Sequence, residues 1–254
     1  MKKILKKIMK RDAYLYQYLK AIDRFGLFKP PFEKNMARTL ESYDLQKGHQ
    51  VHFVQIGSND GLQGDPLHPF IVSHNWKGIL AEPQPPLFEK LVNNYAASRE
   101  RLFFENIAVS RAPGYFPFYF VDPDNKDLPE WLSQLSSFNR EVILKHADYY
   151  PRIADHIKVI NIKTDSFDKM LERNGMENVD LIHIDTEGHD FEILKSIDLD
   201  KYKPEIIIYE QKHLAKAEAR ESVRYLRKKG FRVRLSKSDC IAIRKDLTLK
   251  NPKH

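Results

Sequence analysis

Hydrophobic residues along the chain alternate between short unbroken runs and stretches with helical spacing. The short runs predict buried strands at Val51 to Ile56, Ile79 to Ala81, Phe103 to Val109, Leu181 to Ile184 and Glu205 to Tyr209. An amphipathic helix through Leu87, Leu91 and Tyr95 separates the second run from the third. Strands that alternate with helices are typical of βαβ units, so the pattern predicts an α/β fold with a mostly parallel sheet. A late pair of strands is predicted at Phe231 to Leu235 and Cys240 to Ile243.

The segment between Ser110 and Val179 is too long for a plain connection in a compact domain. It carries two more strand patterns and two helix patterns, at Phe116 to Val121, Lys158 to Ile162, Asn139 to His146 and Phe167 to Arg173. We therefore predict one domain over residues 46–247 with an insertion at residues 110–160. The insertion is either a substrate lid or a structural elaboration, and the pattern leaves both open.

We predict that residues 1–45 form an N-terminal helical segment and that residues 248–254 form a C-terminal tail. Ile4, Ile8 and Met9 stand at helical spacing among lysines, and Pro30 and Pro31 are expected to break the pattern. A basic amphipathic helix can make peripheral contact with an anionic membrane, or it can dock against the domain or a second subunit. Charges interrupt the segment too often for a signal peptide or a membrane span.

Composition narrows the class of protein. A hydrophobic content of 42% and a charged content of 30% are ordinary for a globular chain. Cys240 is the only cysteine, so an intrachain disulfide is excluded and a cytoplasmic location is expected. A net charge of +7 is compatible with binding to the phosphate backbone of a nucleic acid. The excess lies mostly near the two ends and no basic, aromatic-rich recognition motif is present, so nucleic acid is not an expected partner.

Ligands of doubly wound sheets bind at the carboxyl ends of the strands. The candidate functional residues are therefore those that directly follow the predicted strands. The Gly57 to Gly61 turn follows the first strand, and glycine there lets the backbone approach a ligand closely. The turn lacks the G-x-G-x-x-G spacing of dinucleotide-binding dehydrogenases. Glu82 follows the second strand, where an acid can accept hydrogen bonds from the hydroxyls of an adenosine ribose.

Two further groups follow the later strands. The turn from Asp185 to Asp190 gathers carboxylates and an imidazole, which are unfavourable to place together unless they bind or react. Glu210, Gln211 and His213 follow the next strand and would lie beside this turn if the two strands are neighbours. Both groups are candidates for the reacting part of a site.

Four segments in this order resemble the FkbM-type methyltransferase family: Ile56 to Gly61, Trp76 to Pro83, Asn106 to Val109 and Asp180 to Asp190. The ordered match covers about residues 51–243, and the Asp-Thr-Glu-Gly-His-Asp turn is its most specific element. The resemblance implies a Rossmann-like class I methyltransferase fold, with a mostly parallel seven-stranded sheet whose last strand is antiparallel. It also implies S-adenosylmethionine as donor and often an oxygen of a sugar or natural product as acceptor.

The resemblance also implies which residues hold the cofactor. Glu82 would take the ribose hydroxyls, Asn106 and Ala108 would border the adenine, and Asp185 would lie beside the cofactor. The methionine part would be surrounded by Gly57, Ser58, Asn59, Asp60 and Gly61. The chain departs from the family pattern at Gln55, where many such enzymes carry an acid that contacts the cofactor's amino group.

Two ways of activating an acceptor hydroxyl remain open. His189 is the first candidate for a catalytic base, because the ordinary pKa of an imidazole lies near neutrality, and Asp185 and Glu187 are the catalytic candidates beside it. Alternatively, Asp185 with Glu210 and Gln211 is similar to the ligand set of metal-dependent O-methyltransferases, which would hold Mg²⁺ or Mn²⁺.

The expected function is O-methylation of a sugar, glycan or secondary-metabolite hydroxyl. A non-catalytic cofactor-binding or partner-binding protein on the same fold is the alternative from another class, and an RNA methyltransferase is a third. The acceptor's identity and the oligomeric state cannot be read from the sequence. Residues of the insertion that we expect to shape the acceptor site are Trp131, Ser136, Ser137, Phe138 and His146.

Overall fold

The computed structural model describes residues 31–122, 128–129, 132, 135–236 and 238–249. Residues 1–40 and 41–254 form two compact units, and the following paragraphs concern the second, apart from the helix that crosses the boundary. The amphipathic helix predicted between Ile4 and Phe28 lies outside the described residues, as does Trp131. No helix in the described part of the chain is both long enough and apolar enough to span a membrane.

The first described helix is α3 (Pro31–Gln46). This helix begins at Pro31, the second of the two prolines expected to break the preceding helical pattern, which itself lies outside the described residues. Proline is tolerated in the first turn because its missing N–H would have no intrahelical partner there and its fixed φ suits the helix.

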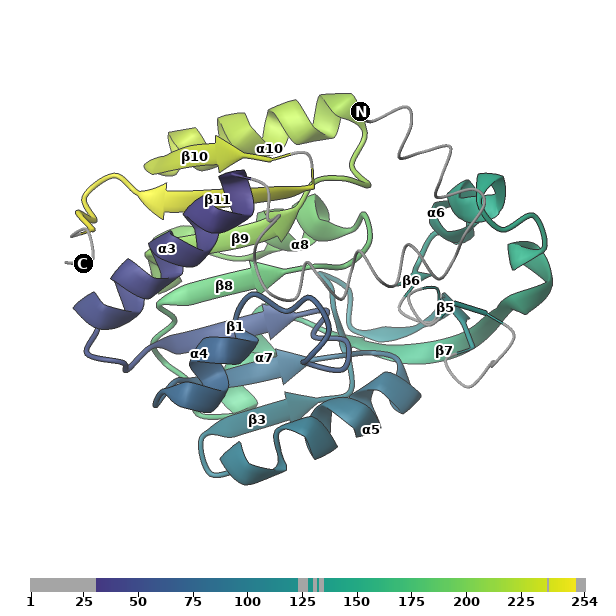
Figure 1. Ribbon diagram of the computed structural model, residues 1–254, viewed down its shortest axis with the longest axis horizontal. Coiled ribbons are helices and arrows are strands. Elements are labelled where there is room, and N and C mark those ends of the chain that lie inside the picture. The colour runs from purple at the N-terminus through teal and green to yellow at the C-terminus, as the bar shows by residue number, and fades with distance from the viewer. Residues whose placement is uncertain (1–30, 123–127, 130–131, 133–134, 237, 250–254) are drawn as a thin grey trace. The chain divides into compact units, whose positions relative to one another are not determined.

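The main sheet contains the seven strands β1 (His52–Ile56), β2 (Lys77–Ala81), β3 (Leu102–Glu105), β8 (Leu181–Ile184), β9 (Ile206–Glu210), β10 (Phe231–Leu235) and β11 (Asp239–Arg244). Their order is β10-β11-β9-β8-β1-β2-β3 (Figure 1). The last strand in the sequence, β11, runs antiparallel to both of its neighbours, and all other pairs are parallel. This confirms the predicted fold class.

Helices cover the sheet because the strands are apolar on both faces. One face packs against α7 (Phe167–Arg173), α8 (Asp190–Ser196) and α10 (Lys216–Lys228) in a single hydrophobic core. The shorter crossovers near β1 to β3 hold α4 (His68–Ser73), α5 (Pro85–Asn94) and the 3-10 turn η1 (Ala96–Ser98), and α9 (Leu199–Tyr202) precedes β9.

The prediction of one strand from Phe103 to Val109 is wrong. The main-sheet strand β3 ends at Glu105, and β4 (Ala108–Val109) pairs with a second sheet. Between them, the Asn106 amide donates to the carbonyls of Glu82 (2.8 Å) and Pro83 (3.2 Å). These bonds hold Asn106 against the turn after β2 instead of extending β3, and the chain then leaves the main sheet.

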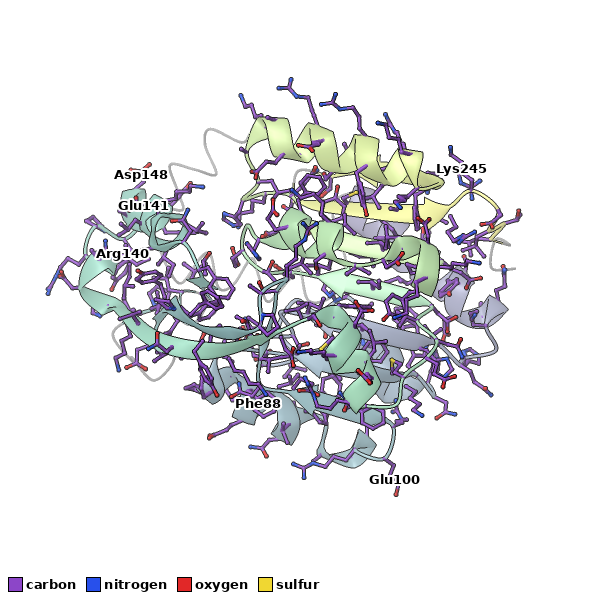
Figure 2. The ribbon with its side chains drawn as sticks, turned by 180° about the vertical axis from the view of Figure 1, so that it is seen from behind. Phe88, Glu100, Arg140, Glu141, Asp148 and Lys245 are labelled. Atoms are coloured by element: carbon purple, nitrogen blue, oxygen red, sulfur yellow. The ribbon has the colours of Figure 1, made fainter. Side chains whose placement is uncertain are left out.

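The second sheet, whose order is β4-β7-β5-β6, takes most of its residues from the range 110–160 predicted as an insertion, but β4 precedes that range and the strand that pairs with it ends at Asp165. Strands β5 (Gly114–Val121) and β7 (Ile157–Asp165) pair antiparallel along their length, and β6 (Ser136–Ser137) pairs with β5. The connection between β6 and β7 contains α6 (Arg140–Leu144) and the 3-10 turns η3 (Lys145–Asp148) and η4 (Ile153–His156). Figure 2 shows Arg140, Glu141 and Asp148 at the end of this small sheet that is farthest from the main sheet.

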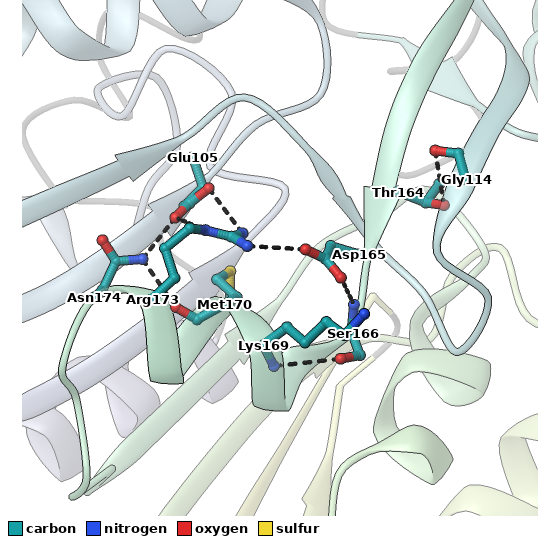
Figure 3. A network of polar contacts seen from close by, with 9 residues as sticks. All are labelled: Glu105, Gly114, Thr164, Asp165, Ser166, Lys169, Met170, Arg173 and Asn174. Carbon is teal, nitrogen blue, oxygen red and sulfur yellow. Dashed lines mark hydrogen bonds and ion pairs between the residues drawn. The ribbon is translucent and has the colours of Figure 1, made fainter.

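A polar network joins the two sheets (Figure 3). Arg173 at the end of α7 contacts both oxygens of Glu105, at 2.8 and 3.0 Å, and Oδ2 of Asp165 at 2.8 Å. Glu105 ends β3 and Asp165 ends β7, so one guanidinium links the carboxyl ends of strands from different sheets. Asn174 adds a hydrogen bond to Glu105 (2.6 Å). The insertion is thus fixed beside the edge of the main sheet where ligands of this fold class bind.

Candidate active site

The glycine turn after β1 brings three strand ends together. Gly57 has a φ of +77°, and a Cβ added there would lie 1.8 Å from the carbonyl oxygen of Asp185. Only glycine permits both the left-handed conformation and this approach to the end of β8. The amides of Gly57 and Ser58 both donate to the carbonyl of Ala81, at 2.9 and 3.0 Å, which closes the turn onto the end of β2.

Glu82 faces this turn. Its side chain is almost fully buried, Oε2 accepts from the amide of Asn59 and Oε1 from the amide of Gln84, each at 2.9 Å. Burial raises the pKa of Glu82 to about 7. A carboxylate offers about four acceptor positions in all, so each oxygen keeps capacity for a ligand hydroxyl.

A cleft of about 900 Å³, including space open to solvent, lies at these strand ends. The predicted site residues that line it are Gly57, Ser58, Asn59, Glu82, Ala108, Asp185, Glu187 and His189. The structure thus brings the acid after β2 and the acid-rich turn after β8 to one cleft.

Other predicted cofactor residues support the cleft without lining it. Asp60 accepts hydrogen bonds from the amides of Leu62 and Gln63, which fixes the loop after the glycine turn. A Cβ on Gly61 would lie 2.4 Å from the ring of Tyr95, so this glycine allows the turn to pack on α5. The Asn106 side chain is occupied by the carbonyls of the β2 turn.

The turn after β8 is held by one buried carboxylate. Asp190 accepts from the Thr186 hydroxyl (3.1 Å), the Gly188 amide (3.2 Å) and the Glu210 amide (3.2 Å). Glu187 and Gly188 within this turn have φ values of +52° and +107°. Backbone in this region is sparsely populated for residues other than glycine, and it persists where the surroundings fix it. The turn places Glu187 at the cleft.

Carboxylates crowd the ends of β8 and β9. Burial, with repulsion from Glu187 and Asp190, raises the pKa of Asp185 well above its ordinary range. Burial and the neighbouring Asp185 and Glu187 raise the pKa of Glu210 to about 10.

The structure brings His213, and not Gln211, to these acids. His213 Nε2 lies 2.8 Å from Glu187 Oε2 and 3.8 Å from Glu210 Oε2. The Gln211 amide instead donates to the carbonyl of Ser236 at 2.7 Å, at the turn between β10 and β11. The sequence placed His213 after the correct strand, but gave no signal of which side chain would turn toward the acids.

The insertion forms part of the cleft wall. Phe118, Ser136 and Phe138 line the cleft, and the ring of Phe138 lies 5.6 Å from that of His189. Burial lowers the pKa of His189, so its imidazole is neutral at neutral pH. Two other residues of the predicted acceptor site lie nearby: Ser137 Oγ donates to the Glu187 carbonyl (3.4 Å), and the His146 ring lies 6.2 Å from that of His213.

Asp65 is a cleft residue that the sequence analysis missed. It lies in the loop before α4, accepts from the Leu67 amide at 2.8 Å, and has its pKa raised by burial to about 6. A hydrogen bond from the Gln55 side chain favours its charged form. The Gln55 amide also contacts Nδ1 of His183 (3.1 Å), and burial lowers the pKa of His183 to about 4. No hydrophobic run precedes Asp65 directly, so strand patterns could not reveal it.

Comparisons with known proteins agree with this architecture. A family model described as "Methyltransferase FkbM domain" matches residues 55–233. The solved structure of methyltransferase FkbM from Methylobacillus flagellatus is 12% identical, with a TM-score of 0.50, over 77% of this chain and 44% of that one. This chain therefore spans less than half the length of that protein, and the likeness shows a shared fold.

Two other solved structures have lower scores. Precorrin-6y C5,15-methyltransferase from Geobacter metallireducens is 12% identical over 82% of this chain and 88% of that one, with a TM-score of 0.42. The Methanococcus jannaschii fibrillarin pre-rRNA processing protein is 12% identical over 78% and 67%, with a TM-score of 0.41. No curated protein matches the chain.

Proposed function

This chain belongs to the FkbM methyltransferase family, and on that premise we propose that it methylates a hydroxyl oxygen of a sugar, glycan or secondary metabolite. Membership of a methyltransferase family implies S-adenosylmethionine as the methyl donor. One observation carries the proposal: the buried carboxylate of Glu82 faces the Gly57 turn, and that turn lies against the carbonyl of Asp185. An acid suited to a ribose and a turn rich in reactive groups therefore border the same cleft.

Residues already positioned in the cleft can hold the donor. Glu82 would accept the two ribose hydroxyls while its oxygens keep their bonds from the amides of Asn59 and Gln84. Gly57 leaves the backbone open for the methionine part. When bound, S-adenosylmethionine supplies a methyl group on a positively charged sulfur, and the nearby carboxylates favour that charge.

Asp65 would replace the acid that many family members carry at the position of Gln55. Its carboxylate lines the cleft beside Gln55, where it can bind the ammonium group of the methionine part. Asp65→Asn should therefore weaken S-adenosylmethionine binding about tenfold or more, the loss expected when a charge-assisted hydrogen bond becomes a neutral one. The exposed acid Asp155 provides the matched control, since Asp155→Asn should leave the affinity unchanged. Equal affinities for the two variants would remove Asp65 from the site.

The chain's main contribution to the reaction is alignment of the acceptor behind the methyl group, an effect that reaches roughly 7 to 11 kcal/mol in favourable systems. The neutral imidazole of His189 can accept the proton of the acceptor hydroxyl, which would add roughly 10² to 10⁴ in rate. Glu187, whose Oε2 lies 2.8 Å from His213 Nε2, is the second candidate base. Burial and repulsion from Glu187 and Asp190 raise the pKa of Asp185 well above its usual range, which disfavours its charged form.

The acceptor class is inferred from the cleft wall. Phe118 and Phe138 give this wall apolar surface, and Ser136 adds a hydroxyl. A ring that carries both C–H and O–H groups, such as a sugar, fits a wall of this mixed character. Acidic side chains across the cleft would disfavour a phosphate-rich polymer, which argues against RNA as the acceptor.

The test is methyl transfer from labelled S-adenosylmethionine to fractionated glycans, secondary metabolites and RNA. We expect label in a glycan or metabolite fraction, on an ether oxygen, with no loss of label on ribonuclease treatment. Label that ribonuclease releases would establish the RNA alternative instead. Donor binding in a calorimetric titration without transfer to any fraction would favour the non-catalytic alternative.

A further inference from the structure

Glu187, Glu210 and His213 point one ligand atom each toward a common position. These atoms all lie within 4.8 Å of one another. His213 Nε2 is 2.8 Å from Glu187 Oε2 and 3.8 Å from Glu210 Oε2. Two atoms that each lie ~2.1 Å from one metal ion are at most ~4.2 Å apart, so both measured separations fit a shared ion.

The three atoms are also buried and unsatisfied. The His213 side chain is 6% exposed, and its Nε2 makes no hydrogen bond despite its short distance from Glu187. Oε2 of Glu187 and Oε2 of Glu210 are equally buried and equally without a hydrogen bond. Buried polar atoms nearly always have a partner in native proteins, so three such atoms around one point indicate a missing ligand.

The cluster is built from fixed backbone. Glu210 is the last residue of β9, and Glu187 is held by the turn after the neighbouring strand β8. A Cβ on Gly188 would lie 3.3 Å from Cβ of His213, so the turn after β8 packs directly on the segment after β9. The donors are thus held in place before any ion arrives, which favours binding.

The surrounding charge also favours a cation. The carboxyl groups of Asp185, Glu187 and Asp190 lie close enough to that of Glu210 to interact with it electrostatically. Lys212 is 4.0 Å from Glu210 Oε1, which leaves the other oxygen directed at His213. A divalent ion at that second oxygen would reduce the repulsion.

We propose that Glu187, Glu210 and His213 form a divalent-cation site at the wall of the cleft. Two carboxylates and one imidazole suit an ion that accepts both oxygen and nitrogen ligands, of which Mn²⁺ is the practical probe. This set differs from the one predicted from the sequence, because His213 takes the place of Gln211 and Glu187 that of Asp185. Glu187 lines the cleft, so the ion could acidify an acceptor hydroxyl there; that role, unlike ion binding itself, rests on the proposed function.

A second group of possible ligands in the described residues provides the matched control. Asp44, His49 and His74 also gather three ligand atoms within 4.8 Å. There, His49 Nδ1 hydrogen-bonds to Oδ2 of Asp44 at 2.6 Å and Trp76 donates to Oδ1, while His74 Nδ1 lies 2.9 Å from Oδ2 without a hydrogen bond. Because this carboxylate is already satisfied, we expect it to bind Mn²⁺ weakly.

The experiment is a titration of the chelator-treated full-length protein with Mn²⁺, in which the electron paramagnetic resonance signal of free Mn²⁺ reports binding. We expect one saturable site in the wild type. His213→Ala and Glu210→Gln should each weaken it at least about tenfold, and His74→Ala should not change it. Glu210→Gln keeps the side-chain volume and replaces a buried carboxyl group crowded by other acids with a neutral amide, so this variant should fold even if His213→Ala does not.

Absence of a saturable site in the wild type would overturn the proposal. So would wild-type affinity in Glu210→Gln, or a loss confined to His74→Ala, which would place the ion at the Asp44 group. Titration with S-adenosylhomocysteine separates this proposal from the proposed function. Cofactor binding without Mn²⁺ binding would refute only the ion site, and the reverse result would refute only the methyltransferase activity.

Discussion

Gly57→Ala tests the close approach between the ends of β1 and β8 on which the cleft depends. The new Cβ would lie 1.8 Å from the carbonyl oxygen of Asp185, and the residue would have to keep a φ of +77°. The obstacle is the backbone that directly follows the central strand β8, which cannot move aside as a flexible side chain could. The two strand ends would have to separate by more than about 1 Å to restore ordinary contact.

The expected loss of stability has two parts. A left-handed conformation destabilises a residue other than glycine by roughly 1 to 2 kcal/mol. Forcing an extra methyl group into packed surroundings adds roughly 1 to 3 kcal/mol. Together they predict a decrease of about 2 to 5 kcal/mol in the free energy of unfolding.

Gly175→Ala is the matched control. Gly175 has a φ of +60°, but a Cβ there would have no atom within 4 Å. Gly175→Ala therefore carries the same cost of a left-handed backbone and the same reduction in the entropy of the unfolded chain as Gly57→Ala, but it introduces no steric clash. Urea unfolding should place Gly57→Ala about 1 to 3 kcal/mol below the control, and calorimetry should show weaker S-adenosylhomocysteine binding in Gly57→Ala alone. Equal stabilities of the two variants would refute the inferred contact between Gly57 and Asp185.

Three further predictions concern charge. Burial raises the pKa of Glu82 to about 7, and only its ionised form accepts both ribose hydroxyls, so S-adenosylhomocysteine affinity should fall up to about tenfold per pH unit below pH 7. Calorimetry of Glu82→Gln should show no such slope; a slope that persists would assign it to another group. For the unliganded protein, the folded-state pKa of Glu82 exceeds the ordinary value of 4.5, so its contribution to the free energy of unfolding should decrease as pH rises from 4.5 to about 7. The urea unfolding midpoints of the wild type and of Glu82→Gln should therefore converge at low pH. If the two midpoints instead changed with pH in parallel, the raised pKa of Glu82 would be contradicted. Arg173→Met breaks the link between the two sheets and should destabilise the protein by about 1 kcal/mol in urea, a value kept low because the guanidinium is partly exposed. Arg152→Met, which breaks an exposed ion pair, should leave the free energy of unfolding unchanged. Equal destabilisation by the two substitutions would count against a stabilising role of the Arg173 network.

Much of the main sheet could be predicted because its strands are buried on both faces and stand out as apolar runs. The glycine turn and Glu82 were found for the same reason, since each directly follows such a run. The third strand was predicted wrongly because its apolar run continues past Glu105, and only the bonds from Asn106 to the turn after β2 divide it between two sheets.

The sequence by itself determined the local elements: which segments are strands, where a turn requires glycine, and which acids follow the strands. The tertiary structure alone decided which side chains meet: Asp65 beside Gln55, Phe138 beside His189, and His213 in place of Gln211 at the acids. The physical reason is that hydrophobic periodicity reports the burial of one segment at a time. The partner of a side chain depends instead on the register of neighbouring strands and on the backbone angles of the turns that leave them, which distant parts of the chain fix together.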